Sequence, residues 1–486
     1  MVRYICRCSF IFRKGDSVMT FLSPAFLFAL LPTVLTVYAI APKYRRAELL
    51  PIISTVFFVC ANIHDVLSLV YYLLAALSFV MALKLYKKTK RTVWLHGLRI
   101  LAAFAAVASA YYKLFFGNFA VEHVGLLIML MAIVSICSDI LRGEGRMPDT
   151  PWDGLIYITF FPTSVIGPFV SYGDFIEKLD NIQFSAENFT RGAVRLMIGF
   201  VKCLAISSVL NQAYEGIISA EGYMGLMIFL LAAFILGLKV YYFLSGYSDM
   251  ARGIALMLGI DLKKDFSNPF LNSTPASYLR RFLRSFSSFA RRYVARPIES
   301  AFSGGFGGRI VGSLLVGAFY VMLISSSAAS ASLIFIPASV AAYFVMYRSS
   351  KNRRLNIPKA LKIPFGMLTF LAISVVWVII KLQSVGSLEE IMGEVLTQNI
   401  FNAPHSVLSV LTSAKYWCLP IFGAAAVSLA SRVLDPETVE GDCTRLQIVF
   451  KLVASAIIFA AFIMSVIFLL PQFPELTGFD RGFVFM

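Results

Sequence analysis

Charged residues are scarce in this sequence, and acidic residues are scarcer than basic ones. Charged residues make up 14% of the 486 residues, against roughly 25% in soluble domains, and 58% are hydrophobic. The mean hydropathy is +0.77. This composition excludes an ordinary soluble domain and indicates a membrane protein with many apolar segments.

The excess of basic residues does not indicate a nucleic-acid-binding protein. Lysine and arginine number 43 against 27 acids, which gives a formal net charge of +16. These bases lie between long apolar runs, where lysine and arginine typically anchor a protein to the anionic surface of a membrane. We therefore expect membrane lipid as a partner and no nucleic acid.

Cysteine and histidine are too few and too scattered for a metal site. The seven cysteines include no CxxC pair, and we interpret them as small buried apolar residues. The four histidines are widely separated. They are His64, His96, His123 and His405. We expect neither a metal centre, nor a disulfide framework, nor a bound cofactor.

Apolar runs follow one another along most of the chain. A spanning helix needs about 20 apolar residues. The runs cover about 21–41, 49–62, 65–83, 98–116, 123–141, 154–172, 190–211, 222–243, 246–260, 308–325, 329–347, 364–382, 405–431 and 447–470. We expect an all-α polytopic membrane protein, in which some of these runs are tilted or re-entrant.

Basic clusters between the runs predict the orientation of the helices. "PKYRR" (42–46) and "KLYKKTKR" (84–91) flank a pair of apolar runs, and the positive-inside rule places both in the cytoplasm. We expect the loop 142–150 and the basic linker 347–362 on the same side. The basic segment 1–18 is too short to span a membrane. We therefore interpret it as an extension before a single domain, 19–486.

One segment carries six arginines and no acid, "YLRRFLRSFSSFARRYVARPI" (278–298). At about 100° per residue, the arginines occupy one side of a helix and the aromatic residues the other. Six arginines in a spanning helix are energetically implausible. The segment is therefore either an anchor at lipid headgroups or the wall of a wet cavity that binds a phosphate-bearing carrier. We expect Pro297 to end this helix. The carrier-binding candidates are Arg280, Arg281 and Arg284, together with Tyr247, Ser248 and Asp249 of an upstream apolar run.

Asp249 lies inside an apolar run, in the sequence "SGYSDM" (245–250). A carboxylate in such a place is unfavourable unless it is paired, so Asp249 marks a buried polar centre. We expect its partner to be Lys239 or an arginine of the segment 280–292. Tyr247 and Ser248 should belong to the same network.

The run 154–172 contains residues that a continuous helix does not favour, Pro162, Gly167 and Pro168. Proline removes a backbone donor from the helix. These residues predict a broken, re-entrant segment that lines a cavity. A kinked helix facing the lipid is the alternative.

Several of these segments together resemble the membrane-bound O-acyltransferase family. The closest branch is the bacterial one with the alginate O-acetyltransferase membrane subunit and the teichoic-acid D-alanyl transferase. The resemblance rests on six stretches that occur in the expected order. They are 21–32, 139–144, 160–175, 241–298, 377–390 and 482–486.

The resemblance implies about eleven spanning helices, with re-entrant and interfacial helices, around a central funnel. It implies an acyl-CoA or acyl-carrier thioester donor on the cytoplasmic side of a bacterial inner or plasma membrane. The acyl group would pass to a cell-surface polysaccharide, together with an extracytoplasmic transferase or a polysaccharide synthase as partner.

The sequence departs from the family where the family carries its histidines. Leu283 and a position near Ser326 occupy the two places, and the usual tryptophans are missing as well. Phe243 and Ser171 replace an aspartate and an arginine that are common in the family. The remaining candidates for a catalytic group are His405 and Asp249. The serines 325–332 are better explained by close helix contacts than by a nucleophile.

Three functions remain open on these grounds. The first is transfer of an acetyl or similar acyl group to a cell-surface polysaccharide. The second is an inactive relative that acts as a scaffold or acyl conduit in a cell-envelope complex, which the missing histidines favour. The third is a transporter, which the absence of a visible internal repeat disfavours.

Overall fold

The protein is described from a computed structural model, and the described residues are helical with connecting turns and loops; they contain no strand. The described residues are 20–63, 66–116, 125–144, 147–165, 167–182, 184–218, 225–266, 278, 281–282, 284–302, 305–324, 335, 338–343, 359–385, 388–397, 407, 420 and 456–469.

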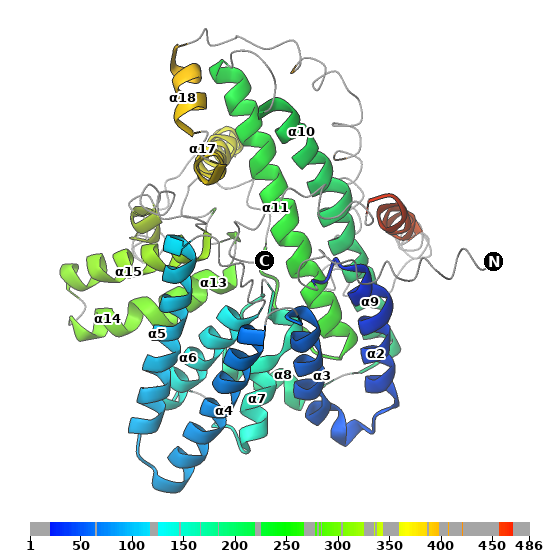
Figure 1. Ribbon diagram of the computed structural model, residues 1–486, viewed down its shortest axis with the longest axis vertical. Helices are drawn as coiled ribbons and strands as arrows, with labels where there is room; N and C mark the ends of the chain where they lie inside the picture. The colour runs from blue at the N-terminus through cyan, green and yellow to red at the C-terminus, as the bar shows by residue number, and fades with distance from the viewer. Residues whose placement is uncertain are drawn as a thin grey trace.

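The helices fall into an N-terminal set and a central set (Figure 1). The first set is η2 (Phe26–Leu30), α2 (Leu31–Ile40), η3 (Lys43–Arg45), α3 (Arg46–Ala61), α4 (Val66–Thr89), α5 (Val93–Phe116), α6 (Leu126–Arg142), α7 (Pro151–Thr159), η4 (Phe161–Thr163) and α8 (Tyr172–Asp180). The second set begins with α9 (Ala186–Phe200), η5 (Val201–Ser207), α10 (Ser208–Ile218) and α11 (Leu226–Met257).

The remaining helices follow the long helix α11 in the chain. They are α13 (Arg284–Phe289), η7 (Ala290–Ala295), α14 (Arg296–Ala301), α15 (Phe306–Ile324), α17 (Lys359–Val385), α18 (Leu388–Thr397) and η10 (Ser465–Leu469). In Figure 1, α11 runs through the middle of the molecule, and α14 and α15 lie side by side at the left edge.

Helices α9 and α11 pack against each other through glycines. A Cβ on Gly199 would lie 2.6 Å from the carbonyl oxygen of Gly246, and one on Gly192 would lie 2.6 Å from that of Gly253. Seven residues separate the two glycines on each helix, and the pairs run in opposite directions along the chain. The two backbones therefore touch along two turns of an antiparallel pair, which only residues without a side chain allow.

Most predicted apolar runs are helices in the structure, and one prediction needs correction. The runs 222–243 and 246–260 form one helix, α11, because the small residues between them pack on α9 instead of breaking the helix. The run 154–172 is interrupted, as its prolines and glycine predicted, since α7 ends at Thr159 and α8 begins at Tyr172. The runs 329–347 and 405–431 lie largely outside the described residues, and the run 447–470 is described from residue 456 to residue 469.

Three described helices are long and apolar enough to cross a membrane. They are Ser68–Thr89, Ala186–Ile218 and Leu226–Met257. Five shorter apolar helices accompany them. These are Phe26–Ile40, Val93–Val107, Phe306–Val321, Gly366–Leu382 and Ala456–Ile467. The predicted number of about eleven spans stays a prediction.

The segments predicted to share the cytoplasmic side meet at one end of the molecule. The Lys87 ammonium donates to the carbonyl oxygen of Asp149 (2.6 Å), and the Trp152 indole donates to that of Glu48 (3.3 Å). At the same end, the Tyr38 hydroxyl donates to the carbonyl oxygen of Leu258, just after α11 (2.9 Å). We call this region the basic end. The linker 347–358 lies outside the described residues.

Replacing Gly246 with alanine is expected to destabilise the protein, because the new Cβ would lie 2.8 Å from the Gly199 carbonyl oxygen. Overpacking of this kind costs about 1–3 kcal/mol, so the thermal-unfolding midpoint in detergent should fall by a few degrees. Gly97→Ala in α5 is the matched control, since nothing lies within 4 Å of its Cβ position. An unchanged midpoint for Gly246→Ala would contradict the close contact of the backbones.

Candidate functional site

The SGYSDM segment lies on α11, where it faces α9 and η5. Ser245, Tyr247 and Ser248 are buried. Asp249 is half-buried, with its side chain 18% exposed. Its carboxylate accepts from the Lys202 ammonium of η5 at 2.5 Å and lies 3.9 Å from a guanidinium nitrogen of Arg252. We call Lys202, Asp249 and Arg252 the Asp249 network.

The predicted partner of Asp249 was wrong. Lys239 donates to the side-chain oxygen of Asn211 (2.6 Å) and lies ten residues, or about 15 Å, from Asp249 along α11. The described arginines of the segment 280–292 form no ion pair with Asp249, and Arg280 lies outside the described residues. Lys202 is the partner because the Gly199–Gly246 contact brings η5 against this turn of α11. A lysine inside the apolar run 190–211 was the signal that could have identified it.

The Asp249 network continues toward the arginine-rich segment. The Arg252 side chain donates to the carbonyl oxygen of Leu262 (2.9 Å), which lies in the loop 258–266 after α11. In that loop, Asp265 accepts from the amide (2.6 Å) and the hydroxyl (2.9 Å) of Ser285, in the first turn of α13. The loop 258–266 therefore contacts the SGYSDM helix through Arg252 and the arginine-rich segment through Asp265. No feature of the sequence pattern had marked Asp265 as a site residue.

Asp265 is an ionisable group with an altered environment. Its side chain lies in the loop and is buried, with 2% of the residue exposed. Burial raises the pKa of Asp265 to about 6, and the two hydrogen bonds from Ser285 and the positive charges of Arg252 and Arg284 oppose that rise. This carboxyl group therefore changes its charge near neutral pH.

The arginine-rich segment has the two faces that its sequence predicted. We call α13, η7 and α14, together with Arg281 and Phe282 just before them, the arginine helix. Its buried face is Phe282, Phe286, Phe289, Ala290 and Tyr293, and its exposed arginines are Arg281, Arg284, Arg291 and Arg296. The helix continues past Pro297, contrary to the prediction. The π-turn of η7 places Pro297 in the first turn of α14, where no backbone N–H is required.

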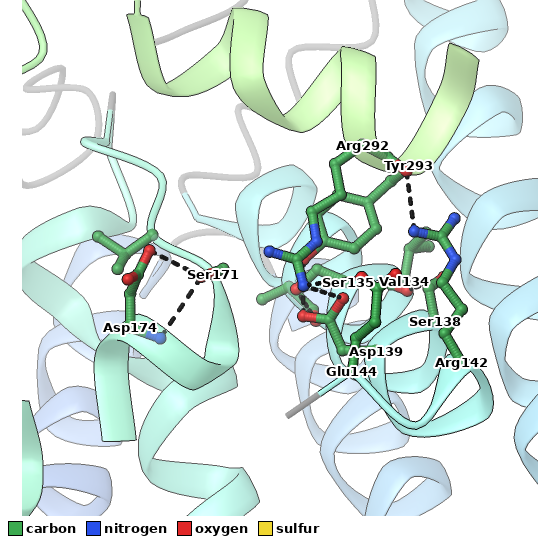
Figure 2. Close-up of polar contacts among 12 residues, drawn as sticks. Val134, Ser135, Ser138, Asp139, Arg142, Glu144, Ser171, Asp174, Arg292 and Tyr293 are labelled. Carbon is green, nitrogen blue, oxygen red and sulfur yellow. Dashed lines mark hydrogen bonds and ion pairs between the residues drawn. The ribbon is translucent and has the colours of Figure 1, made fainter. Parts of the chain in front are cut away.

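Arg292 of this helix pairs with two acids from the end of α6 (Figure 2). Its guanidinium lies 3.1 Å from Asp139 and 3.2 Å from Glu144, at the end of α6. The Tyr293 hydroxyl donates to the other oxygen of Asp139 (2.8 Å). Arg142 donates to the carbonyl oxygen of Arg292 (3.0 Å). The sequence predicted no partner for the stretch 139–144, whose acids hold the arginine helix in the structure.

The break predicted in the run 154–172 is present and is packed inside the protein. The amide of Phe161 donates to the Ser54 hydroxyl (3.1 Å), so the interrupted helix leaves this donor paired. Pro162 is buried, and Gly167, with φ at 104°, precedes Pro168. The ring of Phe169 meets that of Phe289 in the arginine helix at 4.6 Å. The cavity-lining role of Pro162, Gly167 and Pro168 stays a prediction.

A small cavity of about 30 Å³ lies beside this break. It is bounded mainly by aromatic rings and by a few hydroxyl groups. Among the lining residues are Ser54, Phe57, Tyr72, Tyr157, Phe161 and Thr163. A cavity of this size holds one or two waters.

Just after the break, Ser171 caps α8 by accepting from the amide of Asp174 and donating to its carboxylate (Figure 2).

Of the two catalytic candidates, the structure describes Asp249 and not His405, and it describes neither of the positions at which the family carries its histidines. Leu283, Ser326 and His405 lie outside the described residues. Of the histidines, the described part of the chain includes His96, whose ring lies on the surface beside Arg99 (3.4 Å). Groups of three or more His, Cys, Asp or Glu that could bind a metal ion are absent from that part.

Comparisons with known proteins relate the chain to acyl-transferring enzymes. The sequence model of the membrane-bound O-acyltransferase family matches residues 65–320. The Probable alginate O-acetylase of Pseudomonas fluorescens is 25% identical over 287 residues, which is 57% of this chain and 56% of that protein. The chain therefore spans a little over half the length of this relative.

Two further relatives match shorter stretches. The Peptidoglycan O-acetyltransferase of Helicobacter pylori is 25% identical over 153 residues, 30% of this chain and 28% of its own length. The Teichoic acid D-alanyltransferase of Bacillus subtilis is 25% identical over 143 residues, 29% of this chain and 36% of its own length. The Asp249 network and the arginine helix both lie within the family match 65–320.

Removing both Asp249 and Lys202 should be less harmful than the two single removals added together. Asp249→Asn leaves the Lys202 ammonium, 13% exposed, without its counter-charge, which costs about 3 kcal/mol in a buried pair. Asp249→Asn/Lys202→Met should be less destabilising than the sum of the single variants, measured by thermal unfolding. Glu187→Gln, in an exposed pair with Arg191 on α9, is the control. Additive effects would show that the pair is not coupled.

Arg292→Gln should destabilise the protein by about 1–3 kcal/mol, because it leaves the buried Asp139 without the guanidinium of its ion pair. Arg291→Gln removes the same charge from the adjacent exposed position and should change stability by less than about 0.5 kcal/mol. The midpoints of thermal unfolding compare the two variants. Equal midpoints would contradict the holding role of Arg292.

Proposed function

Since the chain belongs to the membrane-bound O-acyltransferase family, we propose that it takes part in transferring an acetyl or similar acyl group to a cell-surface polysaccharide. The three relatives named above support this, as their names describe transfer to alginate, peptidoglycan and teichoic acid. The observation that carries the proposal is the arginine helix, whose apolar face is buried in the protein while Arg281, Arg284, Arg291 and Arg296 are exposed.

The exposed arginines of the arginine helix are the proposed site for the acyl donor. Arg281 and Arg284 have exposed side chains, and Arg280 precedes them in the chain. Guanidinium groups bind phosphates through two parallel hydrogen bonds, which fits the phosphates of acyl-CoA or of a phosphopantetheine carrier. The contact of Ser285 with the loop 258–266 brings this helix near the basic end, which suits a donor from the cytoplasm.

The chemistry requires a group that accepts the proton of the acceptor hydroxyl. In the proposed step, the acceptor oxygen forms an ester bond with the acyl carbon, and the thiol of the donor leaves with a proton. Asp249 is engaged with Lys202 and Arg252, so we assign Asp249 to holding α11 against η5. His405 remains the candidate base, because histidine exchanges protons near neutral pH.

The architecture that we propose is a multi-pass protein of the bacterial inner or plasma membrane, formed by residues 19–486 with about eleven spans. The three long apolar helices and the five shorter ones support this arrangement. An extracytoplasmic transferase or a polysaccharide synthase would receive the acyl group on the far side. A funnel that passes Pro162, Gly167 and Pro168 would connect the two sides.

An inactive relative that acts as a scaffold or acyl conduit is the second candidate function. The specific observation in its favour is that Leu283 and the serines 325–327 stand at the histidine positions of the family. The fold and the polar contacts would then serve assembly of a cell-envelope complex and not chemistry.

Deletion of the gene tests the proposal. The ester-linked acyl content of the envelope polysaccharides should fall on deletion and return with the wild-type gene. Arg281→Gln/Arg284→Gln should raise the apparent KM for the acyl donor about tenfold or more, since charged hydrogen bonds contribute about 1.5–3 kcal/mol. Lys88→Gln/Arg91→Gln, which removes two exposed charges from the α4–α5 turn, is the charge-matched control.

His405→Ala should abolish rescue of the deletion strain if His405 accepts the proton. Full rescue by this variant would remove His405 as the candidate base. An acyl content that the deletion does not change would contradict the enzyme proposal and favour the scaffold.

A further inference from the structure

Asp265 connects the end of α11 to the start of α13. It lies in the loop 258–266 after α11, yet it is 2% exposed, unlike the exposed Asp261 of the same loop. Its carboxylate accepts the amide and the hydroxyl of Ser285, at 2.6 and 2.9 Å. Its own carbonyl oxygen accepts the amide of Arg284 (3.2 Å). One loop residue thus receives three hydrogen bonds from the first turn of α13.

These contacts provide acceptors for the backbone amides of Arg284 and Ser285 at the start of α13. The first N–H groups of a helix have no partner within it, and an aspartate oxygen is a favourable acceptor for them. Asp265 comes from a distant part of the chain, so its hydrogen bonds also fix the position of the arginine helix relative to α11. The Tyr320 hydroxyl of α15 donates to Ser287 in the next turn (2.9 Å).

We propose that Asp265 is a positioning residue, whose buried carboxyl group docks the arginine helix against the end of the SGYSDM helix. Its relevance to acyl transfer rests on the proposed function, because the docked helix carries Arg281 and Arg284. The docking itself does not depend on that function. Release of the contact would let the exposed arginines move relative to Asp249.

The ionisable groups around Asp265 come from three helices. Arg252 faces it from α11 and Arg284 from the arginine helix, and Tyr320 faces it from α15. Lys263, on the same loop, is exposed and pairs with Asp174 (3.0 Å). The two arginines favour the ionised carboxylate, but burial outweighs them and the pKa of Asp265 is raised to about 6.

The direction of the pH dependence follows from this shift. A solvated aspartate has an ordinary pKa of 3.8, whereas the docked carboxyl has a pKa of about 6, so the docked helix binds the proton more tightly. The contribution of protonation to docking is fully present at a pH below 3.8, the pKa of the solvated aspartate. It is lost as the pH rises through 6, the pKa of the docked carboxyl. Docking should be about tenfold stronger at pH 5 than at pH 7.5 if release fully solvates the group.

Hydrogen exchange of the arginine helix measures the docking directly. The purified full chain in nanodiscs is labelled at pH 5 and pH 7.5, and peptides within 284–295 are followed by mass spectrometry, with intrinsic rates corrected for pH. For the wild type, we expect protection about tenfold higher at pH 5. Asp265→Asn keeps an acceptor without charge, so its protection should not change with pH and should exceed the wild type at pH 7.5.

Two further variants and a control complete the test. Ser285→Ala removes one donor to the carboxylate and should shift the midpoint of the pH dependence upward. Asp265→Ala removes the acceptor and should lower protection at both pH values. Asp261→Asn should behave as the wild type. A pH dependence that persists in Asp265→Asn, or protection that Asp265→Ala leaves unchanged, would overturn the proposal.

The exchange experiment needs no acyl donor, so it is independent of the acylation assay. The expected exchange pattern together with unchanged acylation after gene deletion would refute the proposed function and leave the docking role of Asp265 standing. An acyl content that falls on gene deletion, together with an exchange pattern other than the expected one, would refute the docking role alone.

Discussion

The close contact between α9 and α11 is the constraint on which the rest of the site depends. Because Gly199 and Gly246 let the two backbones touch, Lys202 comes within hydrogen-bonding distance of Asp249. An unpaired charge in an apolar bundle is strongly unfavourable, so this pairing is what allows the SGYSDM segment to carry a carboxylate. The glycine of that motif therefore has a steric role and the aspartate an electrostatic one.

From this pair, polar contacts extend to the arginine helix, which is held at two places. Asp265 accepts hydrogen bonds from Ser285 in the first turn of this helix. Asp139 and Glu144, at the end of α6, pair with its Arg292. Between these points, aromatic residues bury one face and leave the other arginines exposed. An element with a fixed apolar face and exposed guanidinium groups suits the binding of a phosphate-bearing donor, which is the basis of the proposed function.

The sequence predicted features that depend on local pattern. The two faces of the arginine helix follow from its 3.6-residue period, and the break before α8 follows from Pro162 and Pro168. Pairing that depends on distant contacts was not predictable in this way. The partner of Asp249 lies 47 residues away across a helix contact, and Asp265, beside two lysines in a loop, has the sequence of a surface acid. The sequence pattern divided helix α11 because Ser245 and Gly246 weaken a helix in isolation, whereas packing on α9 supports them.

A charge-reversal experiment tests the central claim, that Lys202 is the partner of Asp249, most directly. The amount of folded protein recovered from membranes should be low for Asp249→Lys and for Lys202→Asp alone, and it should recover in Asp249→Lys/Lys202→Asp. Recovery in Asp249→Lys/Lys239→Asp, with none in the double variant at position 202, would contradict the pairing and the helix contact that produces it.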